Sequence, residues 1–418
     1  MVKITMDIDK KPPLLLLGGR ENALAIVRSL TKKGITVNAS APEDAHVFRS
    51  RFCQDKYPIP SFVSQNDFWK ELLLGDHKST DQQANAKGEK LKGSVLFACS
   101  DDALQFLIDN RAALEKDYIL DDYNPEIHTA LLSKQATLEL AKSVGVSTPN
   151  FWNVKTLRDL MKIEEEIIFP AIIKPIHSHL FQRQFGGKKY FRAENYDELV
   201  ANATLALDKE LEFMVSELIP GPDTLLSSYY TYHDKSGTPL YHYTKKVNRR
   251  HPMNSGAGCH HESEWLPETA EQGKKFFQGI NFRGIGNIEF KYDTRDNQYK
   301  IIECNTRFTG GHPLLVSSGA DVAHAIYNHL IGQPLPRISN DKNLGYWYPL
   351  PDIAAFLELK ENGLLSFSDW IKSIITKKLV FPFFKWNDPL PSLYEWKKVF
   401  SQKLQRSKLQ LTKIQSLF

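Results

Sequence analysis

One short unit occurs twice in the first 115 residues: an apolar strand, a small polar turn and an amphipathic helix. Its first copy opens with LLLLGG, continues as ENALAIVRSLTKKG and returns to a strand at ITVNAS. Apolar residues at helical spacing before a terminal glycine predict the helix. The second copy is SVLFACSDDALQFLIDNRAAL, in which Ser100 can cap the helix. Such units form a parallel sheet covered by helices, so we expect an α/β domain over residues 1–125.

The pattern changes after residue 125. A helical stretch, HTALLSKQATLELAKSVG, is followed by short strands alternating with helices, and two strands, GNIEFKYD and YKIIECN, close this part. This mixed order predicts an α+β domain over residues 126–334. Residues 335–418 form a third segment, whose end is rich in Lys, Trp and Phe. The polar stretch 75–93 is expected to be a surface insertion, and we assign it no function.

Composition limits the class of protein. The formal net charge of +4 over 418 residues does not indicate a nucleic-acid-binding protein. The four cysteines lack a C-x-x-C pair, which is typical of a reducing compartment. No apolar run reaches the roughly 18 to 20 residues of a membrane span, and the N-terminus is unlike a signal peptide. We therefore expect a cytoplasmic protein with at most peripheral membrane contact.

The strongest local signal is a pair of strands that both carry an acid. GNIEFKYD presents Glu289, and YKIIECN presents Glu303 with Asn305 two residues later. Residues two apart in a strand share a face, so Glu303 and Asn305 point the same way. If the DTRDNQ turn pairs the two strands, Glu289 can lie beside them. Three oxygen ligands suit Mg²⁺ shared with phosphate oxygens; the alternative is a hairpin with ordinary surface acids.

Two basic motifs precede this pair. FPAIIKPI places Lys174 at the end of an apolar strand, and a lysine so embedded requires an anionic partner. In HSHLFQRQFGGKKYF, Gly186 and Gly187 let backbone N–H groups approach phosphate oxygens, and Lys188 adds charge, although the same turn also suits an ordinary hairpin. The histidines of HSH lack a third ligand at suitable spacing, so we interpret them as loop residues.

With these motifs, above all IIECNTRFTGG, the chain resembles the ATP-grasp superfamily over roughly Pro13 to Pro334. The resemblance implies a Rossmann-like N-terminal domain, an ATP-grasp fold of two α+β subdomains clasping ATP, with the nucleotide-binding lid at 150–222, and a small C-terminal extension. It implies ATP and Mg²⁺, or Mn²⁺ in its place, as cofactors. It also implies roles for the motif residues: Glu289, Glu303 and Asn305 as metal ligands, and Arg307 as a contact of phosphate or acyl phosphate.

The same resemblance implies which residues bind the nucleotide. The basic groups and the glycine loop contact the phosphates, the backbone of FMVSELI faces adenine, and an aspartate bonds the ribose. These residues are Lys134, Lys174, Gly186, Gly187, Lys188, Glu217, Leu218, Ile219 and Asp223. On YHYTKKVNRRHP, Lys246 is expected to reach the phosphates, and Arg249 or Arg250 the carboxylate of the acyl substrate.

Other cofactors are not predicted. LLLLGGREN lacks the G-x-G-x-x-G of dinucleotide binding, so NAD is not expected, and Arg20 and Asn22 at this turn are instead candidate substrate contacts by the resemblance. CHHE at residues 259–262 contains zinc-ligand types. Because adjacent residues of a strand point to opposite faces and no fourth ligand is evident, we do not predict zinc or a catalytic cysteine there.

The motifs most resemble the carbamoyl-phosphate-synthase-like and D-aspartate-ligase-like branch of the superfamily. This implies a carboxylate–amine ligase that forms an amide bond through an acyl phosphate, releasing ADP and phosphate, with an amino acid joined to an amine of an amino acid, peptide or sugar. Two alternatives stay open: an enzyme that uses bicarbonate, like carbamoyl-phosphate synthase or biotin carboxylase, and a non-catalytic ATP-binding module.

The C-terminal segment from Ile371 carries about eight more basic than acidic residues. Its Lys and Trp side chains suit an anionic membrane surface or a polymer-linked acceptor, and we favour the alternative of a packed helix with a solvated basic face. Homodimers are common in the superfamily, so a homodimer is a further expectation.

Overall fold

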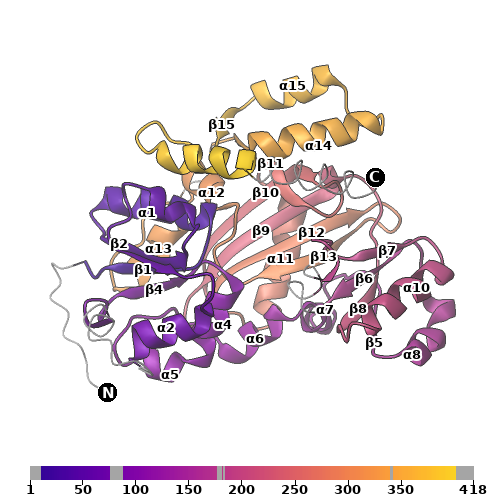
Figure 1. Cartoon of the computed structure of the whole chain (residues 1–418), viewed down its shortest axis with the longest axis horizontal. Coiled ribbons are helices and arrows are strands. Elements are labelled where there is room, and N and C mark those ends of the chain that lie inside the picture. The colour runs from indigo at the N-terminus through magenta and orange to yellow at the C-terminus, as the bar shows by residue number, and fades with distance from the viewer. Residues whose placement is uncertain (1–10, 76–87, 177–180, 182–183, 339–341, 402–418) are drawn as a thin grey trace, which may run out of the picture. The chain divides into compact units, whose positions relative to one another are not determined.

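The computed structural model describes residues 11–75, 88–176, 181, 184–338 and 342–401 (Figure 1). The chain divides into two compact units. Unit 1 comprises residues 1–121, 307–347 and 378–418, and unit 2 comprises residues 122–306 and 348–377. This differs from the three consecutive segments expected from the sequence, because the end of the chain returns to pack with the N-terminal strands and helices.

Unit 1 is built on a parallel sheet with strand order β3-β2-β1-β4. The strands are β1 (Leu14–Leu17), β2 (Val37–Pro42), β3 (Lys56–Ile59) and β4 (Val95–Ala98). Leu14 lies opposite Val37 on one side and Val95 on the other. All four residues of β1 are buried, as expected for a central parallel strand covered on both faces. The parallel sheet predicted from the repeated unit is confirmed.

Helices surround this sheet. They are α1 (Glu21–Leu30), α2 (Gln65–Leu74), α4 (Asp101–Asp109), α5 (Arg111–Leu114), α12 (His312–Ser318) and α13 (Val322–Leu330), with the short helices η1 (Thr31–Lys33) and η2 (His46–Arg49). The Ser100 hydroxyl accepts the N–H of Ala103 and caps α4, as the sequence predicts. α1 is buried along nearly its whole length because α12 and α13 also pack against it.

The end of the chain is joined to unit 1 by buried ion pairs. Arg28 of α1 donates to Asp388 at 2.7 Å, and both side chains are almost fully buried. The Ser50 hydroxyl donates to the same carboxylate at 2.7 Å. Two short strands, β14 (Leu344–Trp347) and β15 (Lys378–Val380), pair in parallel within this unit. A buried, fully hydrogen-bonded charge pair requires both partners, so residues 378–401 are an integral part of unit 1.

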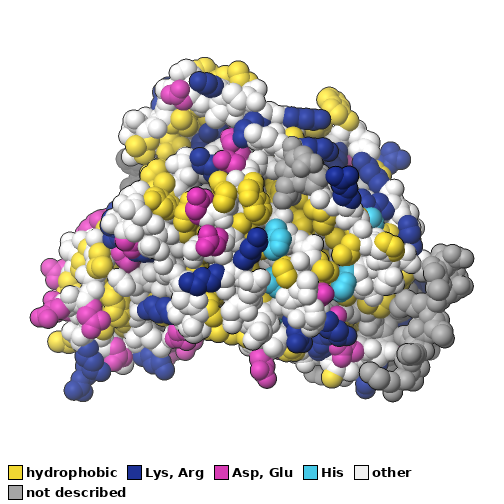
Figure 2. Space-filling model, turned by 180° about the vertical axis from the view of Figure 1, so that it is seen from behind, with side chains coloured by type: hydrophobic (Ala, Val, Ile, Leu, Met, Phe, Trp, Pro, Cys, Tyr) yellow, Lys and Arg dark blue, Asp and Glu magenta, His cyan; other side chains and the backbone are white. Residues whose placement is uncertain are grey.

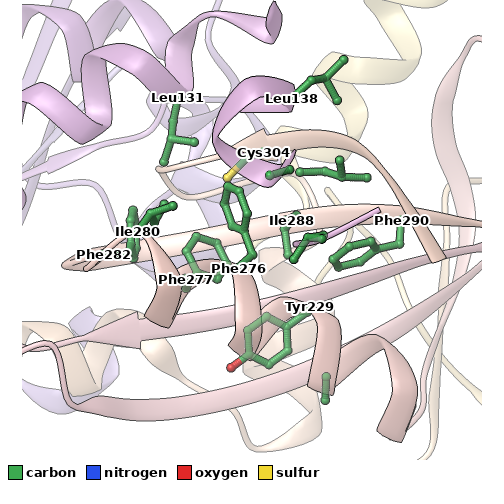
Figure 3. Close-up of a cluster of buried hydrophobic side chains, with 14 of the residues drawn as sticks. Leu131, Leu138, Tyr229, Phe276, Phe277, Ile280, Phe282, Ile288, Phe290 and Cys304 are labelled. Atoms are coloured by element: carbon green, nitrogen blue, oxygen red, sulfur yellow. The ribbon is translucent and has the colours of Figure 1, made fainter. Parts of the chain in front are cut away.

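Unit 2 contains five antiparallel strands in the order β13-β12-β9-β10-β11. They are β9 (Leu226–His233), β10 (Pro239–His251), β11 (Ala257–Ser263), β12 (Gly284–Asp293) and β13 (Gln298–Asn305). One face packs against α6 (Pro125–Leu132), α7 (Lys134–Ser143) and α11 (Pro267–Gly279). Their buried side chains, among them Leu131, Phe276, Phe277 and Ile288, form one core (Figure 3).

A second sheet of unit 2 has the order β5-β8-β6-β7. Its strands are β5 (Phe151–Val154), β6 (Ala171–Pro175), β7 (Phe191–Ala193) and β8 (Phe213–Glu217). The helices α8 (Leu157–Lys162) and α10 (Tyr196–Leu207) pack on it, with η3 (Glu164–Glu166) nearby in sequence, around a separate apolar core. This sheet spans the range expected for the nucleotide-binding lid.

The remaining helices of unit 2 are η4 (Asp223–Leu225), α14 (Pro349–Glu361) and α15 (Phe367–Ile375); α14 packs against β10 and β11. Both Lys or Arg and Asp or Glu side chains lie on the face in Figure 2, and the formal net charge of the chain is +4. Within the described ranges, no helix combines the length and apolar character that crossing a bilayer requires.

Candidate active site

The two acidic strands pair as the sequence predicts. β12 and β13 are antiparallel, with Glu289 directly opposite Glu303 and Asn287 directly opposite Asn305. Opposed residues of an antiparallel pair lie on the same face, so two carboxylates and two amides share one face of the sheet. The other face carries Ile288 and its neighbours in the core. Asn287 was missed in the sequence, although its spacing of two from Glu289 places it on this face.

Glu289 is perturbed by burial and by the charges that surround it. The pKa of Glu289 is raised, first by burial; Lys245 acts in the opposite direction, and the neighbouring charge of Glu303 raises it further. Like charges placed directly opposite each other are unfavourable unless a cation lies between or beside them. The arrangement therefore creates a local demand for positive charge.

The polar atoms around the carboxylates fit a hard cation. The Ser228 hydroxyl and the Asn287 amide oxygen are buried without a hydrogen-bond partner, and Ser228 lies opposite Glu289 in the β9–β12 register. Carboxylate, amide and hydroxyl oxygens are the ligands that Mg²⁺ prefers. Among the residues that the structure describes, no three His, Cys, Asp or Glu side chains form a metal-binding group. A metal here would accordingly depend on an amide oxygen such as that of Asn305 beside Glu289 and Glu303.

Lys174 comes to this cluster from β6. A register shift between β12 and β13 leaves Ile302 without an opposed residue, and Lys174 Nζ donates to the Ile302 carbonyl at 3.1 Å. Burial lowers the pKa of Lys174 to about 8, while Glu303 raises it and Lys134 lowers it. The lysine is thus as embedded as its apolar strand predicts, and its anionic neighbours are the two glutamates. Lys134, at the first turn of α7, contributes to the same electrostatic field.

The pairing of β10 with β9 decides which of two adjacent lysines faces the carboxylates. Lys245 lies opposite Ser228, which lies opposite Glu289, so Lys245 is on the carboxylate face. Lys246 lies opposite Ser227, whose hydroxyl bonds to Thr269 of α11 on the other face. The register therefore places Lys245, and not the predicted Lys246, on the face of the carboxylates. Counting from the motif alone cannot decide between adjacent lysines, because the faces follow from cross-strand pairing.

Lys245 has few interactions that would neutralise it. Its Nζ lies 3.4 Å from His261 Nδ1 and 5.9 Å from the centre of the Tyr230 ring. Burial lowers the pKa of Lys245, and Glu289 opposes that shift. A largely desolvated ammonium beside one carboxylate is well suited to an additional anion such as a phosphate group.

The two candidate arginines of β10 have different surroundings. Arg249 donates to both oxygens of buried Asp352, at 2.7 and 3.1 Å, and to Ser373 at 2.9 Å. This pair is enclosed by α14 and α15, so a substrate role for Arg249 is contradicted. The charge of Arg250 lowers the pKa of Glu289, against the larger effect of burial. It donates to Asp223 at 2.6 and 2.9 Å.

The Asp223 carboxylate accepts its hydrogen bonds from protein groups. One of its oxygens accepts both bonds from Arg250, and the other accepts the N–H of Asn254 at 3.2 Å. In this structure the carboxylate is held by protein groups, whereas the sequence predicts an open ribose contact. A ribose hydroxyl would have to share the carboxylate with Arg250.

The glycine turn has the backbone freedom predicted for it. Gly186 and Gly187 have φ of +61° and +88°, and a side chain at either would meet no atom within 4 Å. Lys188 extends over the Phe191 ring, 5.6 Å from its centre. The adjacent Lys189 has a lowered pKa, first through desolvation, with Glu303 acting in the opposite direction. Lys189 was missed by the sequence interpretation, which assigned the charge to Lys188. The histidines 177 and 179 lie outside the described residues.

The predicted adenine segment lies at the end of β8. The N–H of Glu217 donates to the Asn150 carbonyl at 2.8 Å, and that of Leu218 donates to the Pro170 carbonyl at 3.1 Å. The buried carboxylate of Glu217 bonds to the N–H of Asn150 at 3.0 Å and to Arg295. Its side chain therefore serves to hold the strand and the β12–β13 turn. Ile219 is buried.

Three of the predicted site residues, Arg20, Asn22 and Arg307, belong to unit 1. Asn22 is buried, and its amide nitrogen donates to the carbonyls of Cys99 and Phe308 at 2.9 and 2.7 Å. Its amide oxygen accepts from the N–H of Arg20 at 2.8 Å and from that of the next residue, Ala23, at 2.9 Å. This contradicts a substrate role for Asn22, since its side chain is used in shaping the turn. Arg20 is exposed.

Arg307 forms a two-point ion pair with Asp101. Its Nε and Nη2 donate to the two carboxylate oxygens at 2.6 and 2.9 Å. Asp101 is the first residue of α4 and is mostly exposed. A guanidinium in this geometry can exchange its carboxylate partner for a phosphate, since both accept two parallel bonds. Arg307 follows the metal-ligand candidate Asn305 by two residues.

The Cys259, His260 and His261 run divides between the two faces of β11. His261 lies near Lys245, whereas His260 Nδ1 lies 2.9 Å from Asn248. Burial raises the pKa of the Cys259 thiol, which keeps the thiol protonated and weakly nucleophilic.

The sequence is similar to one family model and to several known ligases. Residues 262–338 match the family model described as "Carbamoyl-phosphate synthase L chain, ATP binding domain". The chain is 24% identical over 309 residues to a D-aspartate ligase of Enterococcus faecium, covering 70% of each protein. It is 25% identical over 211 residues to a D-alanine–D-alanine ligase of Wolbachia pipientis wMel, covering 48% of this chain and 63% of that one.

Solved structures share the fold at low identity. The biotin carboxylase of Campylobacter jejuni superposes with a TM-score of 0.61 at 17% identity, covering 81% of this chain and 75% of that one. The N5-carboxyaminoimidazole synthetase of Staphylococcus aureus superposes with a TM-score of 0.59 at 19% identity, covering 85% and 88%. The fold expected from the motifs is confirmed.

Proposed function

We propose that this chain, which is similar to ATP-grasp ligases, joins a carboxylate to an amine with the cleavage of ATP to ADP and phosphate. The single observation that carries this proposal is the convergence of Glu289, Glu303 and Lys245 on one sheet face, with Lys174 held against the same strands. Facing carboxylates for a metal and buried ammonium groups for phosphate are what phosphoryl transfer requires.

Each group has a distinct task in this reaction. Glu289, Glu303 and Asn305 would hold Mg²⁺, which supplies neutralising charge between the phosphates of ATP. Lys174 and Lys245 position the phosphate oxygens and stabilise the charge that spreads over the transferred group. Arg307 is proposed to exchange Asp101 for the phosphate or the acyl phosphate. No protein nucleophile is needed, because the substrate carboxylate is itself the nucleophile.

The reaction consists of two displacements. An oxygen of the substrate carboxylate attacks the γ-phosphorus, so that an acyl C(O)O–P linkage forms and the bond to ADP breaks. The amine then attacks the acyl carbon, forming the C–N bond and expelling inorganic phosphate, and the amine nitrogen loses a proton. The turn at Gly186 and Gly187 is proposed to lie over the phosphates and limit hydrolysis of the acyl phosphate.

The substrate class follows from the relatives. Both the D-aspartate ligase and the D-alanine–D-alanine ligase are named for amino acids, so we propose an amino acid as carboxylate or amine, with a peptide or a sugar amine as the other substrate class. The match to the carbamoyl-phosphate synthase domain supports a second candidate, in which bicarbonate is the carboxylate.

The test is release of ADP and phosphate from Mg-ATP across a panel of carboxylates and amines that includes bicarbonate. We expect release that requires one carboxylate and one amine and that is lost in Glu303→Ala. Glu268→Ala, which changes an exposed acid of α11, is the matched control and should retain full activity. Release with bicarbonate alone would select the second candidate. The ligase proposal would be contradicted if the parent chain turned over ATP with no pair of carboxylate and amine in the panel, and if Glu303→Ala bound ATP as the parent chain does.

A further inference from the structure

The last helix that the structure describes, residues 390–401, buries an acid, Glu395, and exposes most of its large apolar side chains. Glu395 is 7% exposed, whereas Leu393 is 62% and Phe400 is 59% exposed. Trp386, shortly before the helix, is 89% exposed. A helix on a soluble protein normally has the opposite arrangement, with its apolar stripe on the core. The outer face of this helix therefore suits contact with an apolar partner better than contact with water.

Specific bonds of unit 1 hold the helix in this orientation. The Glu395 carboxylate lies 2.6 Å from His46 Nε2, and both groups are buried. The guanidinium of Arg49 lies over the Tyr394 ring at 4.7 Å. At the start of this segment, the buried Arg28–Asp388 pair fixes the chain. Turning the apolar side inward would break these buried polar contacts, so the outward face is determined by the fold.

The outward residues form one continuous stripe. Leu390, Leu393, Trp396 and Phe400 are each more than a third exposed and are spaced three or four residues apart. Residues at this spacing are neighbours on a helix surface. The rings of Trp396 and Phe400 stack with centres 6.2 Å apart. Contiguous exposed apolar residues of this kind mark a surface that associates with another phase or molecule.

The segment that carries the stripe is rich in basic residues, one of which, Lys398, pairs with Asp44. Residues 371–418 contain ten basic and two acidic residues. The two acids are Asp388 and Glu395, and both are buried in the contacts that anchor the segment. Four of these ten basic residues lie in the sequence 402–418, outside the described residues, and this sequence contains no acid.

We propose that this C-terminal segment, residues 386–401, docks on the surface of an anionic lipid bilayer. Leucine and aromatic side chains would enter the boundary between headgroups and acyl chains, and the lysines would face the negative headgroups. A second copy of the chain is the less suitable occupant, because two surfaces of the same strong positive charge would face each other. This proposal is independent of the ligase reaction, although it would bring the enzyme to a substrate carried by a lipid.

The experiment is co-sedimentation of the full chain with vesicles of phosphatidylcholine alone and of equimolar phosphatidylcholine and phosphatidylglycerol. We expect binding to the anionic vesicles that weakens with added salt. Leu393→Asp combined with Phe400→Asp should lower the partition coefficient at least about tenfold. Lys397→Glu should lower it by about fivefold or more. Phe62→Asp, at an 89% exposed phenylalanine of unit 1 outside this segment, is the matched control and should bind like the parent chain.

Circular dichroism and Mg-ATP affinity establish that the variants are folded, since none of these residues belongs to the candidate active site. Three results would overturn the proposal: no sedimentation with anionic vesicles, equal sedimentation with both kinds of vesicle, or loss of binding in Phe62→Asp to the same extent. Sedimentation velocity without lipid tests the other occupant. A dimer of the parent chain that Leu393→Asp dissociates would assign the stripe to self-association instead.

Discussion

The choice between Lys245 and Lys246 is the sharpest test of the active-site geometry. The perturbation is Lys245→Met, which removes the ammonium and keeps an unbranched side chain of similar length. Lys245 is buried, and among the charged groups it has the largest effect in lowering the pKa of Glu289. Its other close polar contact is His261 at 3.4 Å. The substitution therefore removes positive charge at the carboxylates and leaves the strand packing in place.

The expected magnitude follows from the bond that would be lost. A hydrogen bond between a charged donor and a phosphate contributes about 1.5–3 kcal/mol. Its loss corresponds to a roughly 10- to 150-fold larger dissociation constant for Mg-ATP. Loss of Lys245 also raises the pKa of Glu289, and a protonated carboxyl is a poorer metal ligand, so both effects weaken binding. The free energy of unfolding should change little, because a desolvated ammonium is replaced by an apolar group.

The assay is calorimetric titration of Mg-ATP into the parent chain, Lys245→Met and Lys246→Met. Lys246→Met is the matched control, since it changes the adjacent lysine on the opposite face, and we expect less than about a twofold effect. Urea unfolding of each variant separates lost affinity from lost folding. The reasoning is refuted if Lys246→Met weakens binding more than Lys245→Met, or if both bind Mg-ATP as tightly as the parent chain.

Two further predictions concern stability. Arg249→Met should lower the free energy of unfolding by about 3 kcal/mol in urea, because it removes a cationic partner of the buried Asp352 carboxylate, which keeps the N–H of Trp370 as a neutral donor. Mg-ATP affinity should stay unchanged, and a tenfold loss of affinity would return Arg249 to the active site. The second concerns acid: hydrogen bonds from Arg295, then Lys300, hold the pKa of Asp293 well below its usual value, against the effect of burial. A depressed folded pKa gives stability that is complete above the unfolded pKa of about 4 and is lost as the pH falls from there toward the folded value. Urea midpoints should therefore fall between about pH 4 and pH 2, and fall less in Asp293→Asn; identical slopes would contradict the assignment.

Local sequence patterns were sufficient for several elements. The LLLLGG strand, the helix after it and the Ser100 cap are formed as predicted, because each depends on neighbouring residues within one turn or strand. The β12–β13 hairpin also follows from its sequence, since two alternating strands are joined by the short turn DTRDNQ. The direct pairing of Glu289 with Glu303 additionally depends on the register shift at Ile302. The embedded position of Lys174 follows from the apolar strand that carries it.

Cross-strand register was beyond the reach of these patterns. Lys245 and Lys246 are equivalent in sequence, and only the pairing of β10 with β9 and β12 assigns their faces. Two further register shifts between β10 and β11, around Arg249, direct Arg249 to Asp352 and Arg250 to Asp223. A bulge reverses the face of every residue beyond it, so counting by two from a motif fails there.

The division of the chain into units shows the same contrast. By itself, the sequence determined the strands, the helices, the acidic hairpin and the family resemblance, since these depend on local composition and spacing. Only the tertiary structure returned residues 378–401 to the N-terminal sheet through the Arg28–Asp388 pair and turned the apolar side of the last helix outward. Partners 360 residues apart in the chain leave no trace in local spacing, because the contact exists only once the intervening segments have folded.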